Sequence, residues 1–181
     1  MDYKKKREIM EHYNLMGGRI YDIRYKDEQK SKYDRLLHTV SIKQHQVILD
    51  DGCGTGLLMK KIKTYVIGID ISWRLVSTAR KRLKKRYYAS LIISDAEELP
   101  IRSNIFDFIF SVTLLQNLSD SIKSLNEMKR VTKMDGKIIT TALKKALDAF
   151  TFRKSLESSG FHIDEMILDD DFDWMAVISS Q

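Results

Sequence analysis

The chain has 181 residues, of which 43% are hydrophobic and 31% are charged. This length suits one globular domain, and the composition excludes a fibrous repeat or a disordered chain. No stretch approaches the roughly 20 apolar residues of a membrane helix, and no apolar segment follows the basic start Lys4 to Arg7. With one cysteine and four scattered histidines, we expect a cytoplasmic protein without a disulfide, a metal site or a membrane partner.

Positive charge is concentrated in the first half of the chain. Residues 1–90 hold 21 basic and 10 acidic side chains, whereas residues 91–181 hold 10 and 15, so the halves carry +11 and −5. Clustered cations attract polyanions such as nucleic acid. The basic half is therefore a candidate surface for RNA, although the same charge can serve solubility alone.

The residues before position 46 are polar and rich in tyrosine. Tyr33, Leu36, Leu37 and Val40 recur at spacings of three and four, which predicts a helix over residues 31–40. We expect residues 1–45 to form an N-terminal cap and residues 46–181 to form the core of a single domain.

From Val47 onward, short runs rich in Ile and Val alternate with amphipathic stretches, as in βαβ units. Strands are predicted over residues 47–50, 65–70, 89–94, 106–112, 137–142, 162–168 and 174–179. Helices are predicted over residues 56–63, 73–85, 120–132 and 144–159, and the last two are followed by turns at Asp135-Gly136 and Ser159-Gly160.

A short acidic turn, Asp169 to Asp171, is all that separates the last two predicted strands. Parallel neighbours need a long crossover, so the seventh strand should run antiparallel. The predicted fold is an α/β domain with a seven-stranded sheet of Rossmann-like type, helices on both faces and a short helical cap.

A glycine-dense turn follows the first predicted strand, in the sequence Asp50-Asp51-Gly52-Cys53-Gly54-Thr55-Gly56. Glycines at such a place let a ligand approach the main chain, which is typical of a nucleotide-type cofactor site. A dinucleotide fingerprint would need a third glycine at position 57 or 59, where Leu57 and Met59 stand, and no phosphate-binding Gly-Lys-Ser/Thr follows. The pattern thus disfavours a nicotinamide-dependent oxidoreductase and a triphosphate site.

The spacing Asp50-x-Gly52-x-Gly54-x-Gly56 resembles the first motif of class I S-adenosylmethionine-dependent methyltransferases. The resemblance covers roughly residues 46–179. It implies the fold described above, with S-adenosylmethionine as cofactor and methyl transfer as the activity.

Later segments extend the resemblance. Asp70, at the end of the second predicted strand, matches the family's ribose-binding acidic position, and Ile71 would pack on the adenine. The segment Ser94 to Pro100 is similar to the adenine-contacting loop, where Asp95 and the Ala96 backbone would contact the base. Residues 106–112 resemble the fourth strand, which passes the methyl group and carries Ser111. The resemblance therefore implies this cofactor-binding set: Asp50, Gly52, Cys53, Gly54, Gly56, Asp70, Ile71, Asp95, Ala96 and Ser111.

The methyl acceptor is less clear from the sequence. The positions to inspect follow the fourth strand, among them Thr113, Gln116 and Asn117, and none carries a strong base. Tyr21 and Tyr25 in the cap are candidates for covering the cofactor or stacking on a substrate, with core packing as the alternative. The catalytic base is unknown, with His12 and Asp22 as fallback candidates.

Several functions therefore remain open. The leading expectation is methylation of an oxygen or nitrogen of tRNA or rRNA. The alternatives are a small metabolite, a protein side chain, or a binding module that keeps the fold without catalysis. The family motif for amino methylation of DNA or glutamine is absent. Some small family members act only with a small zinc-binding activator protein, so such a partner is also considered.

Overall fold

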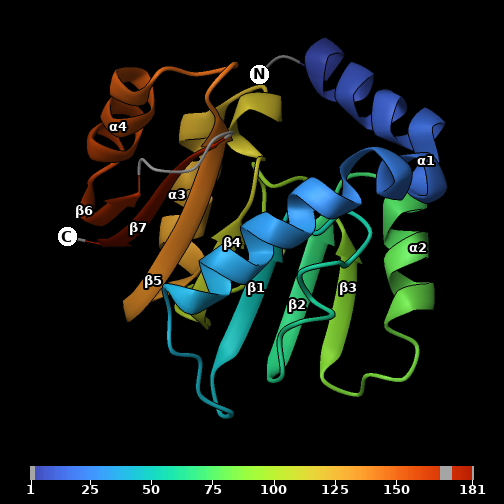
Figure 1. Cartoon of the computed structure of the whole chain (residues 1–181). Coiled ribbons are helices and arrows are strands. Elements are labelled where there is room, and N and C mark those ends of the chain that lie inside the picture. The colour runs from blue at the N-terminus through green and yellow to red at the C-terminus, as the bar shows by residue number, and fades with distance from the viewer. Residues whose placement is uncertain (1–2, 168–172, 181) are drawn as a thin grey trace.

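The computed structural model describes residues 3–167 and 173–180 (Figure 1). Within them lies a seven-stranded sheet with strand order β3-β2-β1-β4-β5-β7-β6. Its strands are β1 (Val47–Asp51), β2 (Tyr65–Asp70), β3 (Ala89–Ile93), β4 (Phe106–Ser111), β5 (Thr132–Leu143), β6 (Phe161–Ile167) and β7 (Asp173–Ser180).

The first five strands are parallel, and β7 inserts between β5 and β6 antiparallel to both. This confirms the predicted fold class and the direction of the seventh strand. The acidic turn that suggested this direction, Asp169 to Asp171, lies outside the described residues, as does the predicted strand end at Leu168.

Three helices follow strands as predicted, and each begins at a polar cap residue. They are α2 (Trp73–Arg82), α3 (Ser121–Val131) and α4 (Ala149–Ser158). Ser72, Asp120 and Asp148 precede them, and the side chain of each accepts a hydrogen bond from a backbone N–H of the first turn. Such capping satisfies N–H groups that have no partner within the helix, which fixes where each helix starts.

The predicted helix over residues 56–63 is wrong, because this segment is a series of turns. Gly56 has a φ of 74°, which is incompatible with a right-handed helix. The bond from Lys60 N to Gly56 O has helical spacing, but the next one, from Lys61 N to Leu58 O, spans only three residues. The segment is held by burial of Leu58, Met59 and Ile62.

The predicted turn at Asp135-Gly136 is also wrong. Both residues lie within β5, which begins directly after α3. The pairing between β4 and β5 shifts register between Phe106 and Phe108, so this part of β5 is irregular. A Cβ at Gly136 would lie 2.8 Å from the Phe106 carbonyl oxygen, so the glycine serves close strand packing rather than a turn.

The cap contains much more helix than the ten residues predicted. Helix α1 (Tyr3–His38) is continuous apart from a kink at Gly17, which has φ 65° and ψ 164°. Figure 1 shows the first part of α1 near the start of α2, and the second part lying across one face of the sheet. That second part buries Gln29, Lys32, Tyr33 and Leu36, which share one helix face.

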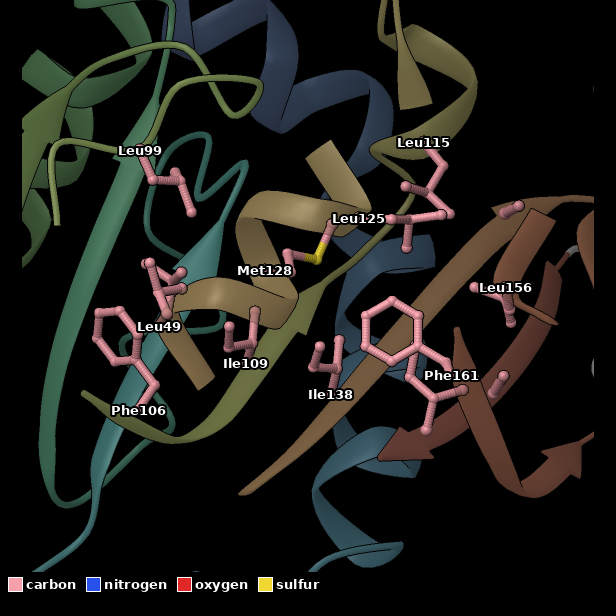
Figure 2. Close-up of a cluster of buried hydrophobic side chains, with 14 of the residues drawn as sticks. Leu49, Leu99, Phe106, Ile109, Leu115, Leu125, Met128, Ile138, Leu156 and Phe161 are labelled. Carbon is pink, nitrogen blue, oxygen red and sulfur yellow. The ribbon is translucent and has the colours of Figure 1, made fainter. Parts of the chain in front are cut away.

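Hydrophobic residues fill both faces of the sheet. Neighbouring strand residues point to opposite faces, so Leu49, Ile109 and Ile138 pack with α3 and α4, whereas Ile48 and Phe110 pack with Tyr33 and Leu36 of α1. Figure 2 shows the first of these clusters, in which Leu125 and Met128 of α3 lie over the strands. The sheet is thereby fixed, and its strand ends are held in place for the site described next.

Candidate functional site

A cavity of about 620 Å³ lies where β1, β2, β3 and β4 end, beneath α1. Its walls come from the glycine turn, from the segments that follow β2, β3 and β4, and from both parts of α1. In open α/β sheets, the carboxyl ends of the strands are the usual place for a bound cofactor. The cavity is therefore the place to examine for chemistry.

Asp70 at the end of β2 holds the glycine turn. Its Oδ2 accepts a hydrogen bond from Gly54 N at 2.8 Å, and its Oδ1 accepts one from Ser72 N at 2.8 Å. Burial raises the pKa of Asp70 to about 6, against the opposing effect of these two N–H donors. Each carboxylate oxygen retains a further lone pair, so Asp70 can still accept hydrogen bonds from a ligand in the cavity.

Two more carboxyl groups end β1. Asp50 is buried, and burial together with the nearby Asp70 raises its pKa to about 8, although the Met59 backbone N–H opposes the shift. Asp51 is fully buried, and burial raises its pKa well above the usual range. Asp51 contributes to the cavity wall, whereas Asp50 does not. Sequence reasoning missed Asp51, and two consecutive acidic residues after an apolar strand were the available signal.

The loop after β3 is tied to α1 by an ion pair network. Lys6 Nζ lies 2.6 Å from Asp95 Oδ2 and 2.7 Å from Glu97 Oε2. Glu97 is buried, and its Oε1 accepts hydrogen bonds from Ser119 N, Ser119 Oγ and Asp120 N. Glu97 therefore connects this loop to the segment after β4, and Lys6 brings the start of α1 onto both.

Three tyrosines of α1 lie next to the glycine turn. The ring centroids of Tyr13 and Tyr21 are 6.3 Å apart, and those of Tyr21 and Tyr25 are 5.1 Å apart. Gly54 has a φ of 52°, and a Cβ there would lie 3.4 Å from the Tyr21 hydroxyl. Burial raises the pKa of Tyr13 to about 12 and raises that of Tyr21 further, so both are neutral phenols at ordinary pH.

The sequence-predicted residues divide into two groups. Five of the ten cofactor-binding candidates line the cavity, namely Gly52, Asp70, Ile71, Asp95 and Ala96, as do all five substrate candidates, Tyr21, Tyr25, Thr113, Gln116 and Asn117. The other five cofactor candidates, Asp50, Cys53, Gly54, Gly56 and Ser111, are buried and form no part of its wall. These five residues belong to the strand ends and the glycine turn and stabilise them without contacting the cavity.

The two fallback candidates for a base also separate. His12 lines the cavity. Asp22 is not part of the cavity wall. Its Oδ1 accepts a hydrogen bond from Thr55 Oγ1 at 2.7 Å, and its Oδ2 pairs with Arg82. Asp22 thus links α1 to the glycine turn and α2, which is a structural role.

Neither a metal centre nor a membrane span emerges from the described part of the chain. No group of three or more His, Cys, Asp or Glu side chains there could hold a metal ion. Among the described helices, none is both long enough and apolar enough to cross a membrane.

The strand order, the antiparallel β7 and an acid-lined cavity at the strand ends define a Rossmann-like protein with a nucleotide-type cofactor site. A family model described as a methyltransferase domain matches residues 49–140. The chain belongs to this methyltransferase family.

Comparison with known proteins agrees with this assignment. The chain is 31% identical over 139 residues to an uncharacterized protein of Methanocaldococcus jannaschii, covering 77% of this chain and 53% of that one. It is 32% identical over 130 residues to a demethylmenaquinone methyltransferase of Staphylococcus aureus, covering 60% and 54%. The chain spans about half the length of these curated relatives.

Solved structures share the fold. A chain from the complex between the Haloferax volcanii Trm112 methyltransferase activator and a methyltransferase superimposes with a TM-score of 0.81 at 14% identity, covering 93% of this chain and 98% of that chain. At this identity the likeness concerns the fold alone.

S-adenosylmethionine, the cofactor of this family, fits the residues present. Asp70 offers free lone pairs for hydroxyl donors, Asp95 offers carboxylate oxygens for an amine, and Ile71 and Ala96 supply apolar surface along the same wall. The carboxyl groups of Asp51 and Asp70, which line the cavity, also suit a cofactor that carries positive charge, because a nearby cation favours the ionised form of a carboxyl group.

Proposed function

We propose that the protein is an S-adenosylmethionine-dependent methyltransferase that methylates an oxygen or nitrogen of a small acceptor bound under α1. One observation carries this proposal. A single cavity is lined by the residues of the cofactor motifs and by polar residues of α1 and of the segment after β4. Cofactor and acceptor would therefore meet in one cavity.

Methyl transfer mainly requires that donor and acceptor are aligned and that water is excluded. S-adenosylmethionine carries an activated methyl group on its sulfonium, and transfer is an in-line displacement. Asp70 and Asp95 would bind and orient the cofactor, while Tyr13, Tyr21 and Tyr25 would cover it from the α1 side. His12 also lines the cavity, and its imidazole is the side chain there that would serve as a general base.

The tRNA or rRNA acceptor expected from charge is the second candidate. It rests on the excess of cations in residues 1–90. Several of these cations are engaged within the protein, because Lys6 pairs with Asp95 and Glu97, Arg82 pairs with Asp22, and Arg86 donates to the Ile62 carbonyl. The demethylmenaquinone methyltransferase among the relatives of this chain supports the small acceptor. The proposal includes a small activator protein as a partner.

The test is calorimetric titration of the purified protein with S-adenosylmethionine and S-adenosylhomocysteine. We expect saturable binding of both, no binding of NAD, and affinity at least about tenfold weaker in Asp70→Ala, because the carboxylate holds both the turn and the ligand. Transfer of labelled methyl groups to extracts fractionated into small molecules, protein and RNA then identifies the acceptor. Failure of both cofactor forms to bind would contradict the proposal, and label in RNA alone would replace the small acceptor with the second candidate.

A further inference from the structure

Two glutamine side chains from different elements contribute to the cavity wall. Gln116 lies in the short 3₁₀ helix η1 (Leu115–Asn117), and Gln29 lies in α1. Both line the cavity, and the Oε1 of each is buried with no hydrogen-bond donor in reach among the residues that the structure describes. Gln29 is only 5% exposed. A buried acceptor without a donor is costly, so both oxygens favour a ligand that donates.

The orientation of Gln116 is fixed by its own amide. Gln116 Nε2 donates to the Thr113 carbonyl at 2.8 Å, and Asn117 Nδ2 donates to the same carbonyl at 2.9 Å. Because the NH₂ group must face this carbonyl, Oε1 is the atom left for a ligand. The Thr113 carbonyl thereby determines that Oε1 of Gln116, rather than Nε2, is left for a ligand.

Thr113 is itself held in an unusual conformation. It has a φ of 58°, which a β-branched residue rarely adopts and which costs free energy. Thr113 N donates to Thr141 Oγ1 at 2.9 Å, and Thr141 Oγ1 donates to Asp173 Oδ2 at 3.2 Å. Such strain persists only where the surroundings enforce it, and here β5 and β7 do so.

The same network reaches Gln29 on α1. Asp173 Oδ2 lies 2.8 Å from Lys32 Nζ, and this ion pair is buried, with side-chain exposures of 0% and 2%. Lys32 Nζ also lies 2.6 Å from Glu28 Oε1. Gln29 is three residues before Lys32 and therefore on the same helix face. One buried charge network thus sets both the position of α1 that carries Gln29 and the turn that carries Gln116.

We propose that Gln116 and Gln29 recognise the methyl acceptor, and that this acceptor carries an N–H or O–H donor, as an amine or a hydroxyl does. This inference rests on the proposed function and deepens it. Two amide oxygens accept hydrogen bonds from such a group, whereas they disfavour a carboxylate or phosphate, which has no donor. A site built to accept from a donor strongly rejects an analogue that lacks it. Thr113, Asp173 and Lys32 are positioning residues for this pair.

The test uses matched probes on protein saturated with S-adenosylhomocysteine. The pairs are aniline with N,N-dimethylaniline and phenol with anisole, in which one member has the donor and the other does not. Dissociation constants come from nuclear magnetic resonance titration, which also reports the side-chain NH₂ signals of Gln116 and Gln29. We expect the donor-bearing member to bind about tenfold more tightly in the unaltered protein, because its partner leaves the acceptors unsatisfied.

Gln116→Met and Gln29→Met keep side-chain length and remove the acceptor. In each variant we expect the ratio of dissociation constants to fall toward one, while the exposed control Gln44→Met keeps the full ratio. Equal affinity within both pairs in the unaltered protein, or an unchanged ratio in both variants, would overturn the proposal. Binding of S-adenosylhomocysteine is measured separately on every variant, so failure of the cofactor site is distinguished from failure of acceptor recognition.

Discussion

Asp50, Asp51 and Asp70 bring three carboxyl groups, the first two of them buried, to the ends of two neighbouring strands. Strand pairing places Asp50 opposite Gly68 and Asp51 opposite Ile69, which lie two residues and one residue before Asp70. Ionising all three carboxyl groups would cost free energy, because the charged forms lose contact with water. Burial accordingly raises the pKa of each. Carboxyl groups with raised pKa values lower the stability of the folded protein. Their presence at these strand ends therefore indicates a binding function.

These raised pKa values predict that stability falls as pH rises. A carboxyl group whose pKa is higher in the folded than in the unfolded state binds more protons when folded, so the free energy of unfolding decreases with pH between the two values. For Asp50 this window runs from its ordinary value of 3.8 to about 8. Each pH unit within it costs up to about 1.4 kcal/mol.

Asp50→Asn tests this expectation, because the amide keeps an acceptor for the Met59 N–H and cannot ionise. Denaturant unfolding at pH 5 and pH 8 should show the unaltered protein losing on the order of 3 kcal/mol more than the variant between the two conditions. Parallel pH dependence in the two proteins would mean that Asp50 ionises normally in the folded state.

Sequence reasoning worked for residues whose role is local. The glycine turn, Asp70 and Asp95 stand at strand ends that the alternation of apolar runs had located, so their meeting at one edge followed from the parallel order. Asp51, Glu97, Gln29 and Lys32 were missed as site residues. Their roles depend on contacts with residues far away in the sequence. A single sequence does not show which of its residues come into contact in the fold.

Among the elements, α1 departs most from expectation. Periodic apolar residues predicted only residues 31–40, because the rest of α1 is held by polar contacts rather than by a hydrophobic stripe. Lys6 pairs with Asp95 and Glu97, and Ser72 Oγ donates to Asn14 Oδ1 at 2.8 Å. Formation of α1 before residue 31 depends on contacts with residues outside the helix, so no local sequence pattern predicted it.

The kink of α1 at Gly17 leads to a prediction about the site. Its φ of 65° and ψ of 164° are essentially restricted to glycine, and space around it is open. Gly17→Ala should therefore cost about 1–3 kcal/mol of unfolding free energy through backbone strain alone. Because the kink aims the segment that carries Lys6, His12 and Tyr13, we also expect weaker binding of S-adenosylmethionine by calorimetry.

Ile23→Ala is the matched control on the same helix, since Ile23 is 75% exposed. Its effect on stability should stay within about 0.5 kcal/mol. If Gly17→Ala binds the cofactor as tightly as the unaltered protein, the first part of α1 is not part of the cofactor site.

At the scale of the whole molecule, the sheet and α1 both contribute walls to the cavity. The sheet supplies Asp70, Asp95 and the turn after β4, and α1 supplies the tyrosines, Gln29 and Lys6. A ligand in this cavity touches both, so its binding energy should stabilise their association as well as the fold.

Thermal unfolding and hydrogen exchange measure these two effects together. At 100 times its dissociation constant, S-adenosylmethionine should add about 2.7 kcal/mol to the free energy of unfolding. For a chain of this size that corresponds to a rise in Tm of about 5–10 °C. Amide exchange should slow in residues 3–16 of α1 more than in α4, which contributes nothing to the cavity wall. A rise in Tm with equal protection of both helices would mean that the cofactor binds to the sheet alone and that α1 does not close over it.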